Sequence, residues 1–183
     1  MKQVIFATGN KGKATYATKL LGFEVVHQAL DLPEIQSLDL RDIIGLKLQR
    51  AFEIIQKPVL VEDVSLEFEA LGKLPGPFVK FFIDQIGLES MCRMLDGKSR
   101  KCTARCIIGY KDADTVKFFE GVRYGEVAQK PTGDGGFGYD KIFIPDGYKT
   151  TRANMNKRDD EATYLQLKRW DLVRDFLNSH KIP

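Results

Sequence analysis

The sequence predicts an α/β fold built on a mixed sheet. From Lys2 to Val61, apolar runs and amphipathic segments alternate as strand, helix, strand, helix and strand, an order typical of α/β proteins. Two later strand-like segments, Cys102–Tyr110 and Val116–Val127, are separated by a short polar turn and predict a long antiparallel hairpin. We therefore expect a single domain over residues 1–183, in which the hairpin adds antiparallel strands and a second lobe.

Helix and strand signals set the boundaries of the elements in the first part of the chain. The pattern predicts a helix over Lys11–Leu21 that ends at Gly22. Asp39 can cap a second helix that runs to about Ile55 and is stopped by Pro58. Short apolar runs around these helices predict strands at residues 2–7, 23–27 and 59–61.

The rest of the chain combines short helices, a glycine-rich loop and a long final helix. Residues 78–86 and 89–95 have a helical pattern, and a glycine-rich loop over 131–138 precedes a short strand at 142–144. We expect the last helix to run without interruption over Arg158–Leu177, with an apolar stripe that includes Trp170.

Composition and charge narrow the class of protein. The net charge of +3 is mild and the basic residues form no stripe, so nucleic-acid binding is not expected. No apolar run approaches the ~18 residues of a membrane helix. The lack of a signal peptide, together with three cysteines in no metal-type spacing, predicts a cytoplasmic protein with reduced thiols. With only two histidines, any divalent ion is expected on oxygen ligands, which favours magnesium or manganese.

The segment Thr8-Gly9-Asn10-x-x-Lys13 lies where the first strand passes into the first helix. Helix N-termini offer backbone N–H groups and a positive dipole, so phosphate is favoured there. Gly9 permits close backbone approach, and Lys13 adds a full positive charge. The alternative is a simple strand-to-helix turn with Asn10 as the N-cap.

Glu62 and Asp63 close a buried apolar strand. In open α/β sheets, active residues gather at the carboxyl ends of strands. Because side chains alternate along a strand, the two carboxylates should point to opposite faces, where one can bind an ion while the other orients or activates water. Glu34 can add a third carboxylate from a loop. The alternatives are an acidic turn after the strand and an exposed Glu34.

The loop from Gly133 to Asp140 combines glycines with two aromatic side chains. Glycines let a backbone wrap a ligand, and Phe137 or Tyr139 can stack on a planar base. Asp140 can accept hydrogen bonds from a ligand. The alternative is a flexible loop whose aromatic side chains fill the core.

Together these segments resemble the inosine triphosphate pyrophosphatase family, enzymes that remove non-canonical purine nucleotides. The resemblance is carried in chain order by Thr8-Gly9-Asn10-x-x-Lys13, Asp31-Leu32-Pro33-Glu34, Leu60-Val61-Glu62-Asp63, Ala70-Leu71-Gly72-x-Leu74-Pro75-Gly76-Pro77, Gly135-Gly136-Phe137-Gly138-Tyr139-Asp140 and Phe143-x-Pro145-Asp146-Gly147-Tyr148. It implies an elongated, twisted mixed sheet flanked by helices, two lobes with a central cleft, and usually a homodimer. It also implies magnesium-dependent hydrolysis of a nucleoside triphosphate to the monophosphate and pyrophosphate.

The resemblance assigns a role to each candidate residue. It implies catalytic roles for Lys13, Glu62 and Asp63, with Asp63 as the base for the attacking water, and a magnesium site at Glu34 and Asp63. The positions that it implies for substrate binding are Thr8, Gly9, Asn10, Lys13, Val64, Phe137, Gly138, Tyr139 and Asp140.

The chain departs from the family pattern where the purine base is read. Counting without gaps from Met155, Asp160 stands at the family's lysine position, and the family's Ser-His-Arg is replaced by Tyr164, Leu165 and Gln166. A one-turn shift of this helix would instead bring Lys157, Arg158 or Lys168 into the site. Smaller departures are Tyr16 in place of an acid, Val64 in place of a serine or threonine, and Lys141 in place of a proline.

Two hypotheses from different classes follow. The first is a magnesium-dependent nucleoside triphosphate pyrophosphatase whose base preference differs from that of its relatives. The second is a nucleotide-binding or regulatory homologue with little catalysis, suggested by the same substitutions. The set of carboxylates disfavours the second hypothesis, because adjacent like charges are unfavourable without an ion.

Overall fold

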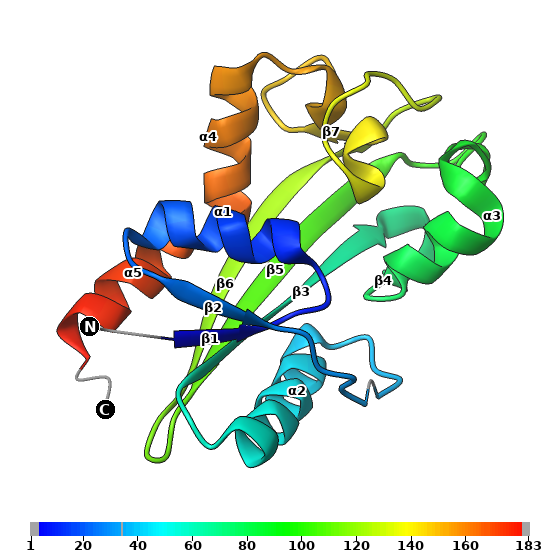
Figure 1. The fold of residues 1–183 in the computed structure, drawn as a ribbon. Helices are drawn as coiled ribbons and strands as arrows, with labels where there is room; N and C mark the ends of the chain where they lie inside the picture. The colour runs from blue at the N-terminus through cyan, green and yellow to red at the C-terminus, as the bar shows by residue number, and fades with distance from the viewer. Residues whose placement is uncertain (1–3, 34, 181–183) are drawn as a thin grey trace. The chain divides into compact units, whose positions relative to one another are not determined.

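The computed structural model of this chain describes residues 4–33 and 35–180. Its strands are β1 (Val4–Ala7), β2 (Val25–Gln28), β3 (Val59–Phe68), β4 (Pro75–Gly76), β5 (Lys101–Lys111), β6 (Val116–Val127) and β7 (Phe143–Pro145). They form one sheet in the order β2-β1-β3-β5-β6-β7, with β4 paired to β3 (Figure 1). β1 is parallel to β2 and β3, whereas β4 and β7 are antiparallel to their neighbours. The predicted mixed α/β sheet is confirmed.

The helices are α1 (Lys11–Leu21), α2 (Leu40–Ile55), α3 (Val79–Arg93), α4 (Lys157–Lys168) and α5 (Trp170–Ser179), with 3₁₀ turns η1 (Glu69–Leu71), η2 (Gly138–Lys141) and η3 (Arg152–Asn154). Within the part of the chain that is described, no helix has the length and apolar character to span a bilayer. The chain divides into two compact units: unit 1 comprises Met1–Asp63, Ile107–Glu120 and Lys168–Pro183, and unit 2 comprises Val64–Cys106 and Gly121–Leu167. The single domain and the cleft between two lobes stay predictions.

The core of unit 1 forms around β1 and β3. Side chains alternate between the two faces of a strand, and the odd-numbered residues Ala7, Val59 and Val61 face α2. They form a buried cluster with the apolar stripe of α2. The stripe and a strand residue complete this cluster: Leu40, Ile44, Leu48, Ala51 and Ile107. Phe6, of the other parity, meets the buried Trp170 of α5 edge-on at 5.6 Å between ring centroids.

Local capping explains why α1 and α2 begin where they do. The Asn10 side chain accepts hydrogen bonds from the N–H groups of Gly12 and Lys13, and Asp39 accepts one from Arg41. At the other end of α1, Gly22 adopts the left-handed conformation at φ 75° that usually ends a helix at glycine. The predicted N-caps, and the bounds of α1, are confirmed.

Unit 2 is organised by the later strands and by α3. β6 pairs with β7 antiparallel, with Glu126 opposite Ile144. Gly87 interrupts α3 at φ 73°, ψ 162°, which accounts for two separate helical patterns in the sequence.

Two predicted boundaries are wrong. The third strand does not close at Glu62 and Asp63 but continues to Phe68, since Leu66 and Phe68 are buried and β4 pairs with this extension. The last helix is not continuous: Arg169 has φ 47°, and its guanidinium binds Asp171 at the start of α5.

Glycine is required at one strand position and dispensable at a helix position. A Cβ at Gly125 would lie 2.2 Å from the carbonyl oxygen of Ile144, whereas a Cβ at Gly45 of α2 would meet nothing within 4 Å. We expect Gly125→Ala to lower the free energy of unfolding by about 1–3 kcal/mol through overpacking. The matched control Gly45→Ala should leave it unchanged or raise it by about 0.5–1 kcal/mol. Urea denaturation measures both, and equal effects would contradict this packing.

Candidate functional site

The loop before α1 is shaped by its own side chains. The Asn10 N–H donates to the Thr8 hydroxyl at 3.2 Å, and His27 Nε2 lies 2.6 Å from the Thr8 carbonyl oxygen. Asn10 is the N-cap of α1, which is the role that a simple strand-to-helix turn predicts for it. The loop therefore sets the positive end of the helix dipole beside two lysines, Lys11 and Lys13, with no acid among residues 11–14.

Glu62 forms the most buried ion pairs in the described part of unit 1. Its side chain is 1% exposed, and its Oε1 lies 2.9 Å from Lys13 Nζ and 2.7 Å from Lys168 Nζ. Burial opposes ionisation of Glu62, but the charges of Lys168 and then Lys13 outweigh it and lower its pKa to about 2. A carboxylate this acidic is a poor general base, so Glu62 is better suited to positioning Lys13 than to taking a proton.

Asp63 points to the other face of β3, as predicted. Its Oδ2 accepts a hydrogen bond from Lys47 Nζ of α2 at 2.7 Å, and its side chain is partly exposed. The predicted second metal ligand, Glu34, lies outside the described residues. Among the residues that are described, no group of three metal-ligating side chains forms. The ion pair with Lys47 engages Oδ2 of Asp63, and magnesium needs only one or two carboxylates beside phosphate oxygens.

The glycine-rich loop belongs to unit 2. Phe137 is 56% exposed, whereas Tyr139 is 8% exposed and packs edge-on against Phe143. Of the two aromatic candidates, Phe137 is therefore the one whose ring is accessible. Asp140 accepts a hydrogen bond from the Phe137 N–H, and at Gly136, with φ 68°, a Cβ would lie 2.6 Å from Asp140 Oδ2.

A buried arginine connects this loop to α4. Arg152 donates to Asp140 Oδ1 at 3.0 Å and to Asp160 Oδ1 at 2.6 Å. Its guanidinium also lies over the ring of Tyr164 at 5.4 Å. Asp160 thus forms an ion pair with Arg152 and Tyr164 makes a cation–π contact with it, while Leu165 and Gln166 are on the surface.

The predicted residues fall into two groups. Thr8, Gly9, Asn10, Lys13, Glu62 and Asp63 belong to unit 1, and Val64, Phe137, Gly138, Tyr139 and Asp140 belong to unit 2. Val64 is the first residue of unit 2 and is partly buried. The assigned roles stay predictions.

Sequence reasoning missed the partners of these residues. Lys47 was not singled out, Lys168 was considered only as a base reader, and Arg152 was not considered. Lys168 lies 106 positions from Glu62, and Arg152 lies 12 from Asp140, so no local spacing reports the pairing. The one usable signal was for Lys47, which shares α2 with the apolar stripe that packs beneath β3.

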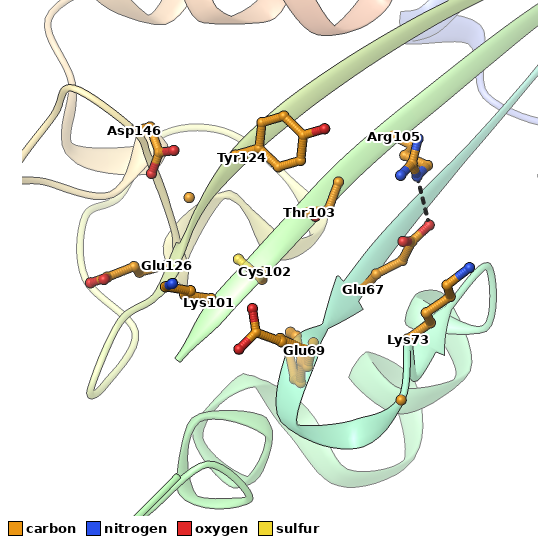
Figure 2. Close-up of a pocket in the computed structure, with 13 residues that line it drawn as sticks. Glu67, Glu69, Lys73, Lys101, Cys102, Thr103, Arg105, Tyr124, Glu126 and Asp146 are labelled. Atoms are coloured by element: carbon orange, nitrogen blue, oxygen red, sulfur yellow. Dashed lines mark hydrogen bonds and ion pairs between the residues drawn. The ribbon is translucent and has the colours of Figure 1, made fainter. Parts of the chain in front are cut away.

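A separate cavity of about 580 Å³ lies within unit 2 (Figure 2). Side chains of both charges line it, among them the acidic Glu69 and Asp146 and the basic Lys73. Arg105 and Glu67, which also line it, form an ion pair at 3.0 Å. None of the predicted site residues that are described lines it. The cavity is therefore distinct from the residues on which the functional prediction depends.

The acidity of Glu62 gives a pH-dependent stability. Because its pKa falls from 4.5 to about 2 on folding, the stabilisation is fully present above about pH 4.5 and is lost as the pH falls through about 2. We expect the unfolding free energy of the wild type to fall in this window by on the order of 3 kcal/mol more than that of Glu62→Gln. Urea denaturation at several pH values measures the difference. Parallel pH profiles would show that Glu62 is not selectively stabilised as an anion.

Comparisons with known proteins identify the family. Residues 4–164 match the model of the Ham1 family. The chain is 36% identical to an inosine triphosphate pyrophosphatase of Schizosaccharomyces pombe over 99% of this chain and 98% of that protein. It is 39% identical to a dITP/XTP pyrophosphatase of Methanopyrus kandleri over 84% of each chain. The structure of the Staphylococcus aureus Ham1 protein superposes with a TM-score of 0.83 at 26% identity, covering 98% of this chain and 100% of the other. The resemblance seen in the sequence is confirmed, and this chain belongs to the Ham1 family.

Proposed function

We propose that this protein hydrolyses non-canonical purine nucleoside triphosphates, such as ITP, dITP or XTP, to the monophosphate and pyrophosphate. The observation that carries the proposal is the buried Glu62 carboxylate, which holds two lysines at the positive end of α1. The ammonium group of Lys13 lies at the N-terminus of a helix whose first turn contains no acid, which suits a polyphosphate. The names of the relatives agree with this reaction class.

Two sets of residues bind the substrate, one the triphosphate and the other the nucleoside. Lys13 and the loop Thr8–Asn10 bind the triphosphate through charge and backbone N–H groups. Phe137 stacks on the base, and Gly138, Tyr139 and Asp140 shape the loop that holds the nucleoside. Val64 completes the substrate-binding set.

The chemical step needs a water molecule and no covalent nucleophile. Water attacks the α-phosphorus, its oxygen forms the new P–O bond, and the bond between the α-phosphorus and the bridging oxygen breaks. Pyrophosphate leaves with that oxygen, and Asp63 accepts the proton of the attacking water. Lys13 stabilises the charge that develops on the phosphate oxygens, and Glu62 keeps Lys13 in place.

Magnesium, with manganese as a possible substitute, is part of this proposal. Asp63 would hold the ion together with Glu34 and the phosphate oxygens. When bound, the ion neutralises phosphate charge at the reacting centre. Lys47, which pairs with Asp63 in the described structure, is the side chain that would have to share this carboxylate with the ion.

The expected homodimer and cytoplasmic location belong to the same proposal. The family resemblance supports the dimer. The three cysteines, all buried and unbridged in the described structure, are compatible with a reducing compartment.

A panel of nucleoside triphosphates tests the reaction. In the presence of magnesium we expect ITP, dITP and XTP to release pyrophosphate, and we expect chelation with EDTA to stop the release. Because Asp160, Tyr164, Leu165 and Gln166 stand where the resemblance implies base readers, we expect the preference for these nucleotides over ATP to be weak. Pyrophosphate release from none of the nucleotides would contradict the proposal. Tight nucleotide binding without release would favour the non-catalytic alternative.

Asp63→Asn tests the base assignment. Loss of the proton acceptor should lower kcat for ITP by about 10²–10⁴-fold while the unfolding midpoint changes little. Asp159→Asn, which removes a carboxylate from the surface of α4, is the matched control and should retain wild-type turnover. Near-normal turnover by Asp63→Asn would remove Asp63 from the mechanism.

A further inference from the structure

Lys168 is the more deeply buried of the two lysines on Glu62. It is the last residue of α4, its side chain is 4% exposed, and its Nζ donates to Glu62 Oε1 at 2.7 Å. Lys13 Nζ lies 2.9 Å from the same oxygen, but the Lys13 side chain is 19% exposed. One carboxylate oxygen thus binds two ammonium groups that differ in their access to solvent.

The chain on either side fixes Lys168 in this position. Arg169 turns the backbone at φ 47°, which ends α4 directly after Lys168. The next residue, Trp170, is buried against Phe6 of β1. Lys168 is therefore held by the backbone as well as by its salt bridge, while Lys13 extends from the first turn of α1.

Glu62 has two ammonium partners, so one of them can turn to another anion without leaving the buried carboxylate uncompensated. A phosphate that arrives at the N-terminus of α1 can pair with Lys13, the more exposed lysine. If Lys13 were the sole partner of Glu62, this movement would leave a buried carboxylate without a counterion.

We propose that Lys168 is a positioning residue that keeps Glu62 neutralised and so releases Lys13 to bind the phosphate groups of the substrate. The inference rests on the proposed function for the identity of the anion. A purely structural salt bridge would contribute to stability alone. A positioning role also changes phosphate affinity, because without Lys168 the whole charge of Glu62 competes with phosphate for Lys13.

Pyrophosphate binding measured by calorimetry tests this role without requiring turnover. We expect Lys168→Met to raise the Kd for pyrophosphate by about tenfold or more, a 1.4 kcal/mol effect. Lys168→Arg, which keeps the charge, should stay within about threefold of the wild type. Lys157→Met removes the same charge from the exposed start of α4. As the matched control, it should change Kd by less than about twofold.

Removal of Glu62 should reverse the effect. In the double variant Glu62→Gln/Lys168→Met no carboxylate competes for Lys13, so its Kd should be several-fold lower than that of Lys168→Met. If Lys168→Met does not fold, Lys168→Gln, which also removes the charge but keeps a polar side chain, takes its place in both comparisons.

Two results would overturn the inference. The first is an unchanged Kd in folded Lys168→Met, and the second is a double variant that binds no better than Lys168→Met. Wild-type protein that binds pyrophosphate but hydrolyses no nucleotide would refute the proposed function and leave this inference standing.

Discussion

The ion pairs of Glu62 are the constraint on which the proposed phosphate-binding residues depend. They join β3 to the first turn of α1 and to the last residue of α4. A carboxylate that is 1% exposed can remain charged only because two ammonium groups offset the cost of its burial. Loss of either lysine would leave the other tied to Glu62, so the position of Lys13 and the anionic state of Glu62 are set together.

Local physics made much of the fold predictable. The bounds of α1 follow from Asn10 and Gly22, because the cap and the left-handed turn are encoded by residues within a few positions of each other. The end of β3 was not predictable in this way. Two adjacent acids normally mark a turn, and only distant lysines allow Glu62 to lie inside a buried strand. The break at Arg169 likewise has no glycine or proline to announce it.

The candidate site shows the same division. Thr8, Asn10 and Lys13 could be found from the sequence, since the strand-to-helix transition carries its own chemistry. The residues that form ion pairs with the predicted site residues could not be found in this way. Arg152 of η3 pairs with Asp140 of η2 and with Asp160 of α4, and its guanidinium lies over Tyr164. Two of the positions at which the resemblance predicts base readers, Asp160 and Tyr164, thus contact the buried Arg152.

The central claim is that a water molecule attacks the α-phosphorus of a triphosphate held by Lys13. Hydrolysis of ITP in water labelled with heavy oxygen tests it directly, because mass spectrometry of the products locates the bond that is cut. The label should appear in inosine monophosphate and be absent from pyrophosphate. Label in the pyrophosphate, or release of single phosphate groups in place of pyrophosphate, would contradict the claim.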